Sequence, residues 1–130
     1  MINDLIGLRH ESGANFSPNK QTIDCFALFS ETRRRLGLYD YYDDFKWVYN
    51  TSSDTLPVIK IFRQIKKIAV PTNSPRDGDL VVLPAKTGGI GLGVVINDGI
   101  LTITDKNLSF WRPMISGAKF WTPINETRLN

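Results

Sequence analysis

Apolar and polar residues follow two different periods along the chain, and the change falls near residue 70. Before it, apolar residues recur at helical spacing; after it, short β-branched runs alternate with turns of Gly, Pro and Asn. Helical segments followed by a series of short strands indicate an α+β domain with an antiparallel sheet. We therefore predict N-terminal helices, over about residues 2–69, packed on a C-terminal β meander of about five strands, over about residues 78–123.

Three helical segments are expected in the first half. The first covers residues 3–8 and is followed by a loop over residues 9–21. The second covers residues 22–36, with Thr22 as the N-cap and Gly37 as a left-handed C-cap. Residues 38–50 are aromatic and acidic, and we expect a loop with a short helical turn there.

The third helix has the clearest pattern in the sequence. One stripe is apolar and the opposite face is basic, with Lys60, Arg63 and Lys67. Asp54 or Thr55 is expected as its N-cap, and Pro57 fits the first turn. The apolar stripe consists of Val58, Ile61, Phe62, Ile65, Ile68 and Ala69. This pattern predicts a helix that packs on the core and implies no chemistry.

The expected strands in the second half are bounded by turn residues. A turn over residues 75–79 precedes them, Gly88-Gly89 separates the first two, and Asn97-Asp98-Gly99 predicts a hairpin, because Asp-Gly readily adopts the positive φ values of a type I′ turn. The tail over residues 124–130 is expected to fray. The strands are expected over residues 80–83, 92–96, 100–104, 108–114 and 119–122.

Composition narrows the class of protein. The chain has 130 residues, of which 42% are hydrophobic and 11% aromatic, a composition typical of one globular domain. No apolar run approaches the ~20 residues of a membrane span, and the N-terminus lacks the pattern of a Sec signal peptide. A single cysteine, Cys25, and a single histidine, His10, exclude an internal disulfide and a Cys- or His-rich metal site, so no metal or cofactor is expected.

The net charge of +3 comes from 16 basic and 13 acidic residues, and the only dense basic cluster is Arg33, Arg34 and Arg35. The cluster falls in the last turn of the second predicted helix, where cations meet the negative end of the helix dipole. We therefore favour a solvated helix end over a nucleic-acid patch, and no specific nucleic-acid partner is expected.

Cys25 is the best chemical candidate. A thiol in the first turn of a helix lies at the positive end of the dipole, which favours the thiolate, and the preceding loop of small residues could leave the sulfur accessible. The alternative is a small buried hydrophobic residue, the commoner role of a lone cysteine. The residues alone leave both interpretations open.

Several segments resemble the NlpC-type cysteine endopeptidases, which have a permuted papain-like fold and cleave the peptide stems of bacterial cell wall. These segments are Gly7–Asn15 and Ile23–Leu28 around Asp24-Cys25, then Gly37-Leu38, Arg76–Val81 and Gly91–Ile96. The resemblance spans about residues 2–104 and implies Cys25 as the nucleophile position. The chain length and the aromatic connection with Trp47 are most similar to versions from tailed-bacteriophage tails.

The chain departs from that family at the proton-transfer residue. By this register the general-base histidine position is Gly91, which has no side chain to accept the thiol proton. The third polar position of the family would fall at Thr102 or Thr104. His10 falls where the family usually has a tyrosine and could act as a substitute base, or it could be an exposed loop residue.

Two functions follow from the resemblance and its departures. The first is a catalytically degenerate NlpC-like domain that serves as a structural or assembly component of a bacteriophage tail, in contact with other tail proteins in the virion and made in the bacterial host cytoplasm. Tyr39, Tyr41, Tyr42 and Trp47 are its candidate interface aromatics, since Tyr and Trp are enriched at interfaces. Trp111 and Trp121 could serve an interface or cap the sheet. The second is an active peptidase or amidase that cleaves peptidoglycan stem peptides through Cys25.

Overall fold

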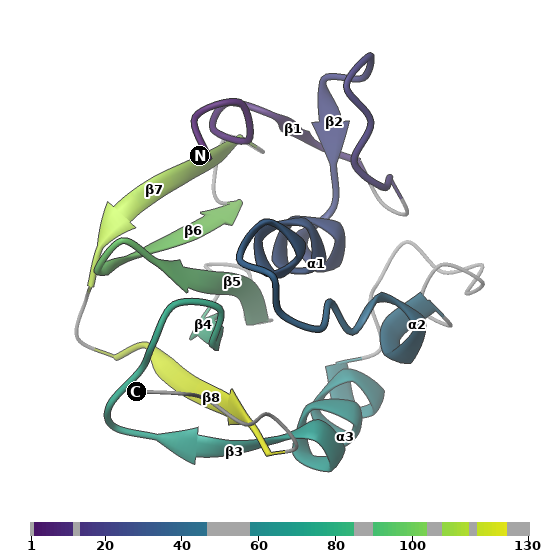
Figure 1. Cartoon of the computed structure of the whole chain (residues 1–130). Helices are drawn as coiled ribbons and strands as arrows, with labels where there is room; N and C mark the ends of the chain where they lie inside the picture. Colours follow the sequence, from purple (N-terminus) through teal and green to yellow (C-terminus); the bar gives the residue numbers. More distant parts are fainter. Residues whose placement is uncertain are drawn as a thin grey trace.

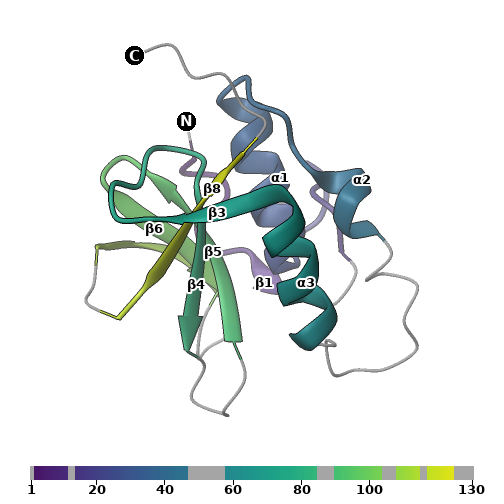
Figure 2. The same ribbon diagram turned by 90° about the horizontal axis from the view of Figure 1, so that it is seen from below.

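The computed structural model describes residues 2–11, 14–46, 58–84, 90–103, 108–114 and 117–124. In this part of the chain, helices pack on one side of a six-stranded antiparallel sheet (Figures 1 and 2). The α+β prediction is confirmed, and the sheet has one strand more than the five expected.

The helices are α1 (Cys25–Arg35), α2 (Tyr42–Phe45) and α3 (Val58–Ile68). α1 begins later than predicted, because its N-cap is Asp24 rather than Thr22. The Asp24 carboxylate accepts a hydrogen bond from the Ala27 N–H at 2.7 Å. Gly37 has φ +73°, as expected for a left-handed helix end.

Thr22 lies instead in β2 (Thr22–Ile23), which pairs in parallel with β1 (Arg9–His10). These two short strands were not predicted. A two-residue strand within a loop has no alternation long enough to be read from the sequence.

The predicted helix over residues 3–8 is wrong, since this segment forms successive turns. The Leu5 N–H donates to the Ile2 carbonyl, as in a turn, but the following residues bond to the sheet: the Gly7 N–H donates to the Ser109 carbonyl at 2.7 Å. Gly7 also has φ +96°, which no right-handed helix accepts.

The short helical turn after residue 38 is confirmed by α2, and the apolar stripe of the third helix by α3. α3 ends at Ile68, so Ala69 belongs to the next strand rather than to the helix. The cap candidates Asp54 and Thr55, as well as Pro57, lie outside the described residues.

The sheet consists of a four-stranded meander and two further strands added at its β4 edge. Its order is β3-β8-β4-β5-β6-β7, so four consecutive strands, β4 to β7, form the predicted meander. β8 does not extend that meander; it pairs with the opposite edge of β4, and β3 pairs with β8. The strands are β3 (Ala69–Thr72), β4 (Leu80–Pro84), β5 (Ile90–Ile96), β6 (Gly99–Ile103), β7 (Ser109–Pro113) and β8 (Lys119–Pro123).

β3 is an edge strand that carries a proline. The Ile124 N–H donates to the Ile68 carbonyl at 2.9 Å, and hydrogen-bonded pairs alternate along an antiparallel ladder, so Val70 directs its backbone groups at β8. The backbone groups of Pro71 therefore point away from β8, so the missing N–H of proline removes no hydrogen bond from the β3–β8 pair. The proline also removes a donor that a passing strand could use.

The hairpin between β5 and β6 turns on Asn97 and Asp98, with φ +52° and +60°, which is the type I′ geometry. The hairpin prediction is confirmed, but the positive φ values fall one residue earlier than Asp-Gly. Gly99 is the first residue of β6, and a Cβ there would lie 2.2 Å from Cε2 of Trp111. Gly99 is therefore required by the packing of the Trp111 ring.

Both faces of the sheet are packed. One face meets the helices in the main cluster, which includes Phe29 of α1, Leu92 of β5 and Leu101 of β6. The other face holds a smaller cluster. Its buried members are Val81, Leu83, Val95 and Ile100. Because neighbouring residues of a strand point to opposite faces, β4, β5 and β6 each contribute buried residues to both clusters.

Candidate functional site

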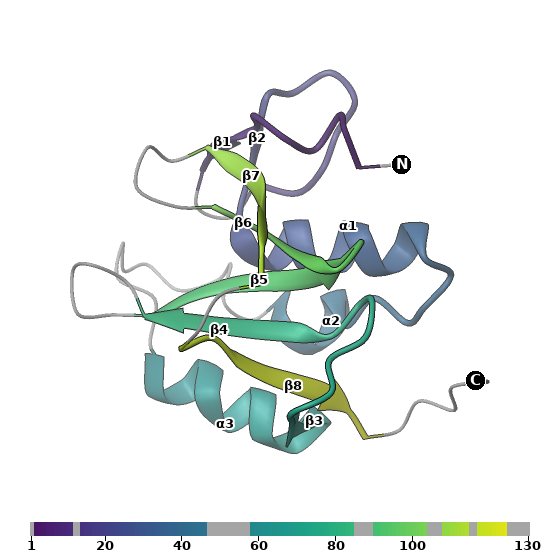
Figure 3. The same ribbon diagram turned by 90° about the vertical axis from the view of Figure 1, so that its left-hand side faces the viewer.

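The first residue of α1 is Cys25, so the thiol does lie in the first turn of a helix. Figure 3 shows that α1 and β5 begin at the same end of the molecule. The side chain is half-buried and packs against the main cluster. The sulfur therefore contacts apolar side chains, as in the second of the two interpretations of this residue.

The pKa of the Cys25 thiol is raised from 9.0 to about 12. Burial is the larger cause, because it disfavours the charged thiolate, and the negative charge of Asp24 adds to it. The carboxylate that caps α1 is itself buried, so its charge acts on the thiol at close range. The backbone N–H groups of Cys25 and Phe26 do lower the pKa, as expected at the start of a helix, but burial and Asp24 outweigh them. The expectation of a lowered pKa is therefore wrong for the net effect.

His10 is exposed on β1, where it pairs with the fully buried Ile23. This pairing brings the histidine close in the fold to the segment that leads into α1. Across the described residues, however, no hydrogen bond joins His10 to Cys25. The exposed-residue interpretation fits the position of His10 better than the substitute-base interpretation.

Gly91 lies on the face of the sheet that points away from α1. Its partner on β4 is Leu83, a member of the smaller cluster, whereas the next residue, Leu92, belongs to the main cluster. A side chain at residue 91 would therefore not point toward Cys25. The position of β5 that faces the helix is occupied by an aliphatic residue, so the conclusion that a base is missing holds at either position.

Thr102 lies on the same face as Gly91, opposite Gly93 of β5. It is fully buried, and its hydroxyl donates to the Leu92 carbonyl at 2.9 Å. The hydroxyl is thus satisfied within the sheet and cannot orient a base next to α1. Thr104, the other candidate for the third polar position, lies outside the described residues.

The arginine cluster at the end of α1 is not a solvated patch. Arg33 is fully buried, and it donates to the Tyr39 carbonyl and the Gly78 carbonyl, each at 2.6 Å. Arg34 and Arg35 form ion pairs with Glu31, Asp40 and Asp4. The solvated helix-end interpretation is wrong for Arg33. Helical spacing is the signal that identifies it, because Arg33 follows Phe26 and Phe29 by seven and four residues and so lies on their buried face.

The candidate interface aromatics separate by exposure. Tyr39 is 57% exposed and Tyr42 is half-buried, but Tyr41 is buried, so its prediction as a surface residue is wrong. Tyr41 packs edge-on against Tyr39 and lies under the Arg33 guanidinium, 5.1 Å from the centre of the ring. Trp47 lies outside the described residues.

Trp111 and Trp121 both make contacts that stabilise the sheet and its packing. The Trp111 indole N–H donates to the Ile96 carbonyl at 2.9 Å, across Gly99. The Trp121 ring meets Phe62 of α3 edge-on, with ring centres 6.5 Å apart. These contacts favour sheet capping over an interface role for both residues.

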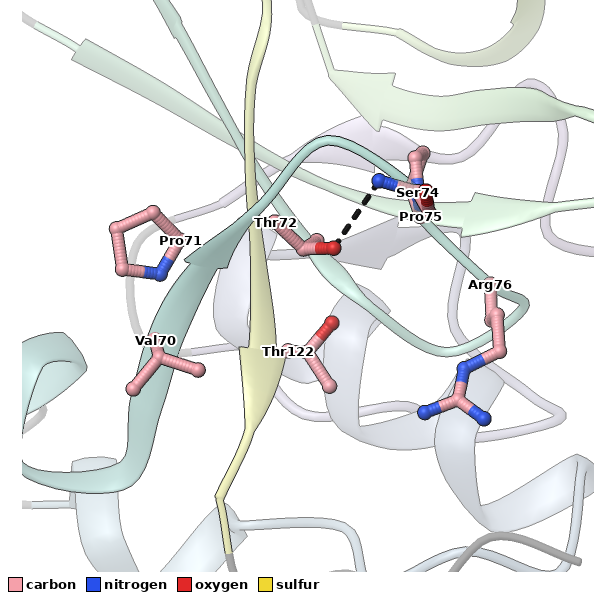
Figure 4. Close-up of a pocket in the computed structure, with 7 residues that line it drawn as sticks. All are labelled: Val70, Pro71, Thr72, Ser74, Pro75, Arg76 and Thr122. Atoms are coloured by element: carbon pink, nitrogen blue, oxygen red, sulfur yellow. Dashed lines mark hydrogen bonds between the residues drawn. The ribbon is translucent and has the colours of Figure 1, made fainter.

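A pocket of about 640 Å³ lies beside β3, between that strand and the loop that follows it (Figure 4). The buried Asp79 carboxylate accepts the Thr122 hydroxyl and the Arg76 N–H at 2.8 and 2.9 Å. Asp77 and Asp79 lie within three residues of Arg76, the charged residue of the lining, so the local charges oppose one another. This balance gives no preference for an ionic ligand. The pocket is lined by Val70, Pro71, Thr72, Ser74, Pro75, Arg76 and Thr122.

Within the described part of the chain, no three His, Cys, Asp or Glu side chains gather as they would around a metal ion. Nor does any helix there have the length and apolar character to cross a membrane. No family model, curated protein or solved structure matches the chain.

Two residues that organise this region were not singled out from the sequence. Asp24 is the true cap of α1, and an Asp directly before an apolar helix was a readable signal for that role. Asp79 holds the turn before β4 through the Arg76 N–H and the hydroxyl of β8. Its partner on β8 is 43 residues away, which no local pattern reveals.

Proposed function

We propose that this chain is a catalytically degenerate NlpC-like domain that acts as a structural or assembly component of a bacteriophage tail. The observation that carries the proposal is the state of Cys25. A nucleophilic cysteine must form a thiolate, and here burial and the Asp24 carboxylate hold the pKa near 12.

The surroundings of the thiol support the same conclusion. The strand positions that face α1 from β5 and β6 include Leu92, Leu101 and Ile103, none of which can accept a proton. A thiol with a pKa of about 12 is almost wholly protonated at pH 7. The assignment to a phage tail rests on the resemblance of the sequence segments to tail versions of the family.

Alkylation of Cys25 tests the non-catalytic part of the proposal. We expect the rate of reaction with iodoacetamide to stay far below that of a free cysteine at pH 7 and to rise continuously to the highest pH at which the chain is folded. A rate that reaches a plateau at or below pH 7 would instead reveal an activated thiol and favour the alternative, an active peptidase. Cys25→Ala provides the background, since the chain has no other cysteine.

Peptidoglycan turnover is the matching activity test. We expect no release of stem peptides from purified cell wall by the wild-type chain above the level of Cys25→Ala. Release that the wild type supports and Cys25→Ala abolishes would overturn the proposal.

The tail assignment needs a test on particles. We expect antibody–gold conjugates raised against the chain to label the tails of the phage that encodes it. Labelling confined to the capsid, or found only in particle-free lysate, would contradict the assignment while leaving the absence of catalysis intact.

A further inference from the structure

One face of α3 carries cations that the rest of the described chain does not neutralise. Lys60, Arg63, Lys66 and Lys67 are exposed, and within the described residues none of the four takes part in an ion pair or hydrogen bond. Lys60, Arg63 and Lys67 are three and four residues apart, so they form one stripe about 10 Å long on the helix. We call this stripe, with Lys66 beside it, the basic face.

The neighbouring helix offers charges of the opposite sign, but they bond elsewhere. α2 contacts α3 in the fold, and its carboxylates are Asp43 and Asp44. Asp43 lies 3.7 Å from the Lys46 ammonium, and Asp44 accepts the Tyr39 hydroxyl at 3.0 Å. The acids and the basic face therefore do not meet within one molecule.

The acidic segment also carries exposed aromatic surface. Among the large hydrophobic side chains of the described residues Tyr39 is the most exposed, and Tyr42, three residues on, is half-buried. Tyrosines ringed by polar groups are typical anchors of protein interfaces. We call Tyr39, Tyr42, Asp43 and Asp44 the acidic aromatic segment.

We propose that the basic face of α3 docks on the acidic aromatic segment of a second copy of this chain. The inference rests on the proposed assembly role and names its partner. The basic face lies on α3 and the acids lie on α2, and these helices contact each other. Two copies related by a two-fold axis can therefore make the contact twice and form a closed pair, whereas copies that use the two surfaces with different neighbours form a ring or a filament. Lysine-rich surfaces orient and accelerate association, while the tyrosines supply the apolar contact.

A charge-swap experiment tests the contact. Variant A reverses the basic face with Lys60→Glu, Arg63→Glu and Lys67→Glu. Variant B reverses the acidic segment with Asp43→Lys and Asp44→Lys, and leaves Asp40 in place because its carboxylate accepts the Tyr42 N–H. Sedimentation velocity over a concentration series measures the mass of each variant and of an equimolar mixture.

We expect the wild type to self-associate and to dissociate as salt rises, with affinity about tenfold weaker at 0.5 M than at 0.05 M salt. Each variant alone should be monomeric, and the mixture should regain mass, because each surface of A then meets an opposite charge on B. A control that reverses Arg9 of β1 and Lys20, just before β2, should behave as the wild type, because both are exposed and these strands lie far from α3 (Figure 3).

A monomeric wild type at all concentrations, or a mixture of A and B that stays monomeric, would overturn the inference. So would binding of a short DNA duplex by a monomeric wild type that Variant A loses, since the basic face would then serve phosphate groups. Gold-labelled tails together with a monomeric chain would overturn the self-contact alone and leave the proposed function standing.

Discussion

Among the fully buried side chains of the described residues, the largest is that of Arg33. Its guanidinium lies 5.6 Å from the ring centre of Phe29 and donates to carbonyls of two other segments, at Tyr39 and Gly78. A buried charge is tolerated only when hydrogen bonds replace its water. Arg33 therefore ties the end of α1 to the segment before α2 and to the turn before β4.

Arg33→Met should lower the free energy of unfolding by about 2 to 3 kcal/mol, because two buried carbonyls lose a charged donor. The free energy of unfolding of Arg33→Lys should lie between those of the wild type and Arg33→Met, because an ammonium keeps the charge but cannot donate to both carbonyls as the planar guanidinium does. Arg34→Met, which removes only exposed ion pairs, should change stability by about 0.5 kcal/mol at most. Urea unfolding measures all three, and equal effects of the Arg33 and Arg34 changes would contradict this role.

The raised pKa of Cys25 also predicts how stability depends on pH. Between pH 9 and pH 12 the unfolded thiol is ionised while the folded thiol keeps its proton, so unfolding releases a proton and stability falls as pH rises. Relative to Cys25→Ala, the wild type should lose up to about 1.4 kcal/mol per pH unit in this window and nothing below pH 8. Urea unfolding of both proteins from pH 7 to pH 10.5 isolates the thiol, and parallel pH profiles would contradict the raised pKa.

Among the elements, the hairpin between β5 and β6 has one feature set by its own residues and one set by a distant residue. Asn97 and Asp98 adopt the turn, as their residue types predict. Gly99, in contrast, is fixed by Trp111, which lies on the neighbouring strand β7 and covers the glycine. The sequence revealed the turn but not the reason for its glycine, because the ring that needs the space is twelve residues away.

Gly99→Ala should destabilise the chain by about 1 to 3 kcal/mol, because the added methyl overlaps the indole. Trp111→Ala should also destabilise it, through loss of the ring and of the bond to the Ile96 carbonyl. The double variant should cost clearly less than the sum of the two, since the methyl then enters the space of the missing ring. Additive free energies of unfolding would mean that the two residues do not compete for this space.

At the scale of the whole molecule, the sequence predicted elements whose cause is local and missed those whose cause is distant. α3 was predicted from its apolar stripe, and strands β4 to β8 were predicted from short runs of strand-forming residues bounded by turns. β3 was not, because four residues with a proline become a strand only by pairing with β8, some fifty residues on. The carbonyl partners of Arg33, at Tyr39 and Gly78, and the face on which Gly91 lies depend in the same way on the assembled fold.

The layout of α1 against β5 can be tested at residues 91 and 92. Leu92 lies on the sheet face that packs with Cys25, and Gly91 lies on the other, although ordinary van der Waals space is open for a Cβ at residue 91. Of these two positions, only residue 92 should therefore place a histidine on the side of the sheet where it can change the pKa of the thiol. Leu92→His should lower the pKa of Cys25 and speed its alkylation at pH 7, at a cost of about 2 to 4 kcal/mol in stability for the lost leucine.

Gly91→His is the matched control, and its alkylation rate should equal that of the wild type because the imidazole enters the opposite face. The pH dependence of alkylation separates the two variants, with near-ultraviolet circular dichroism showing that each is folded. Faster alkylation in Gly91→His than in Leu92→His would mean that β5 presents its odd-numbered residues to α1. A working base could then be placed at the glycine, as the resemblance to the peptidases implied.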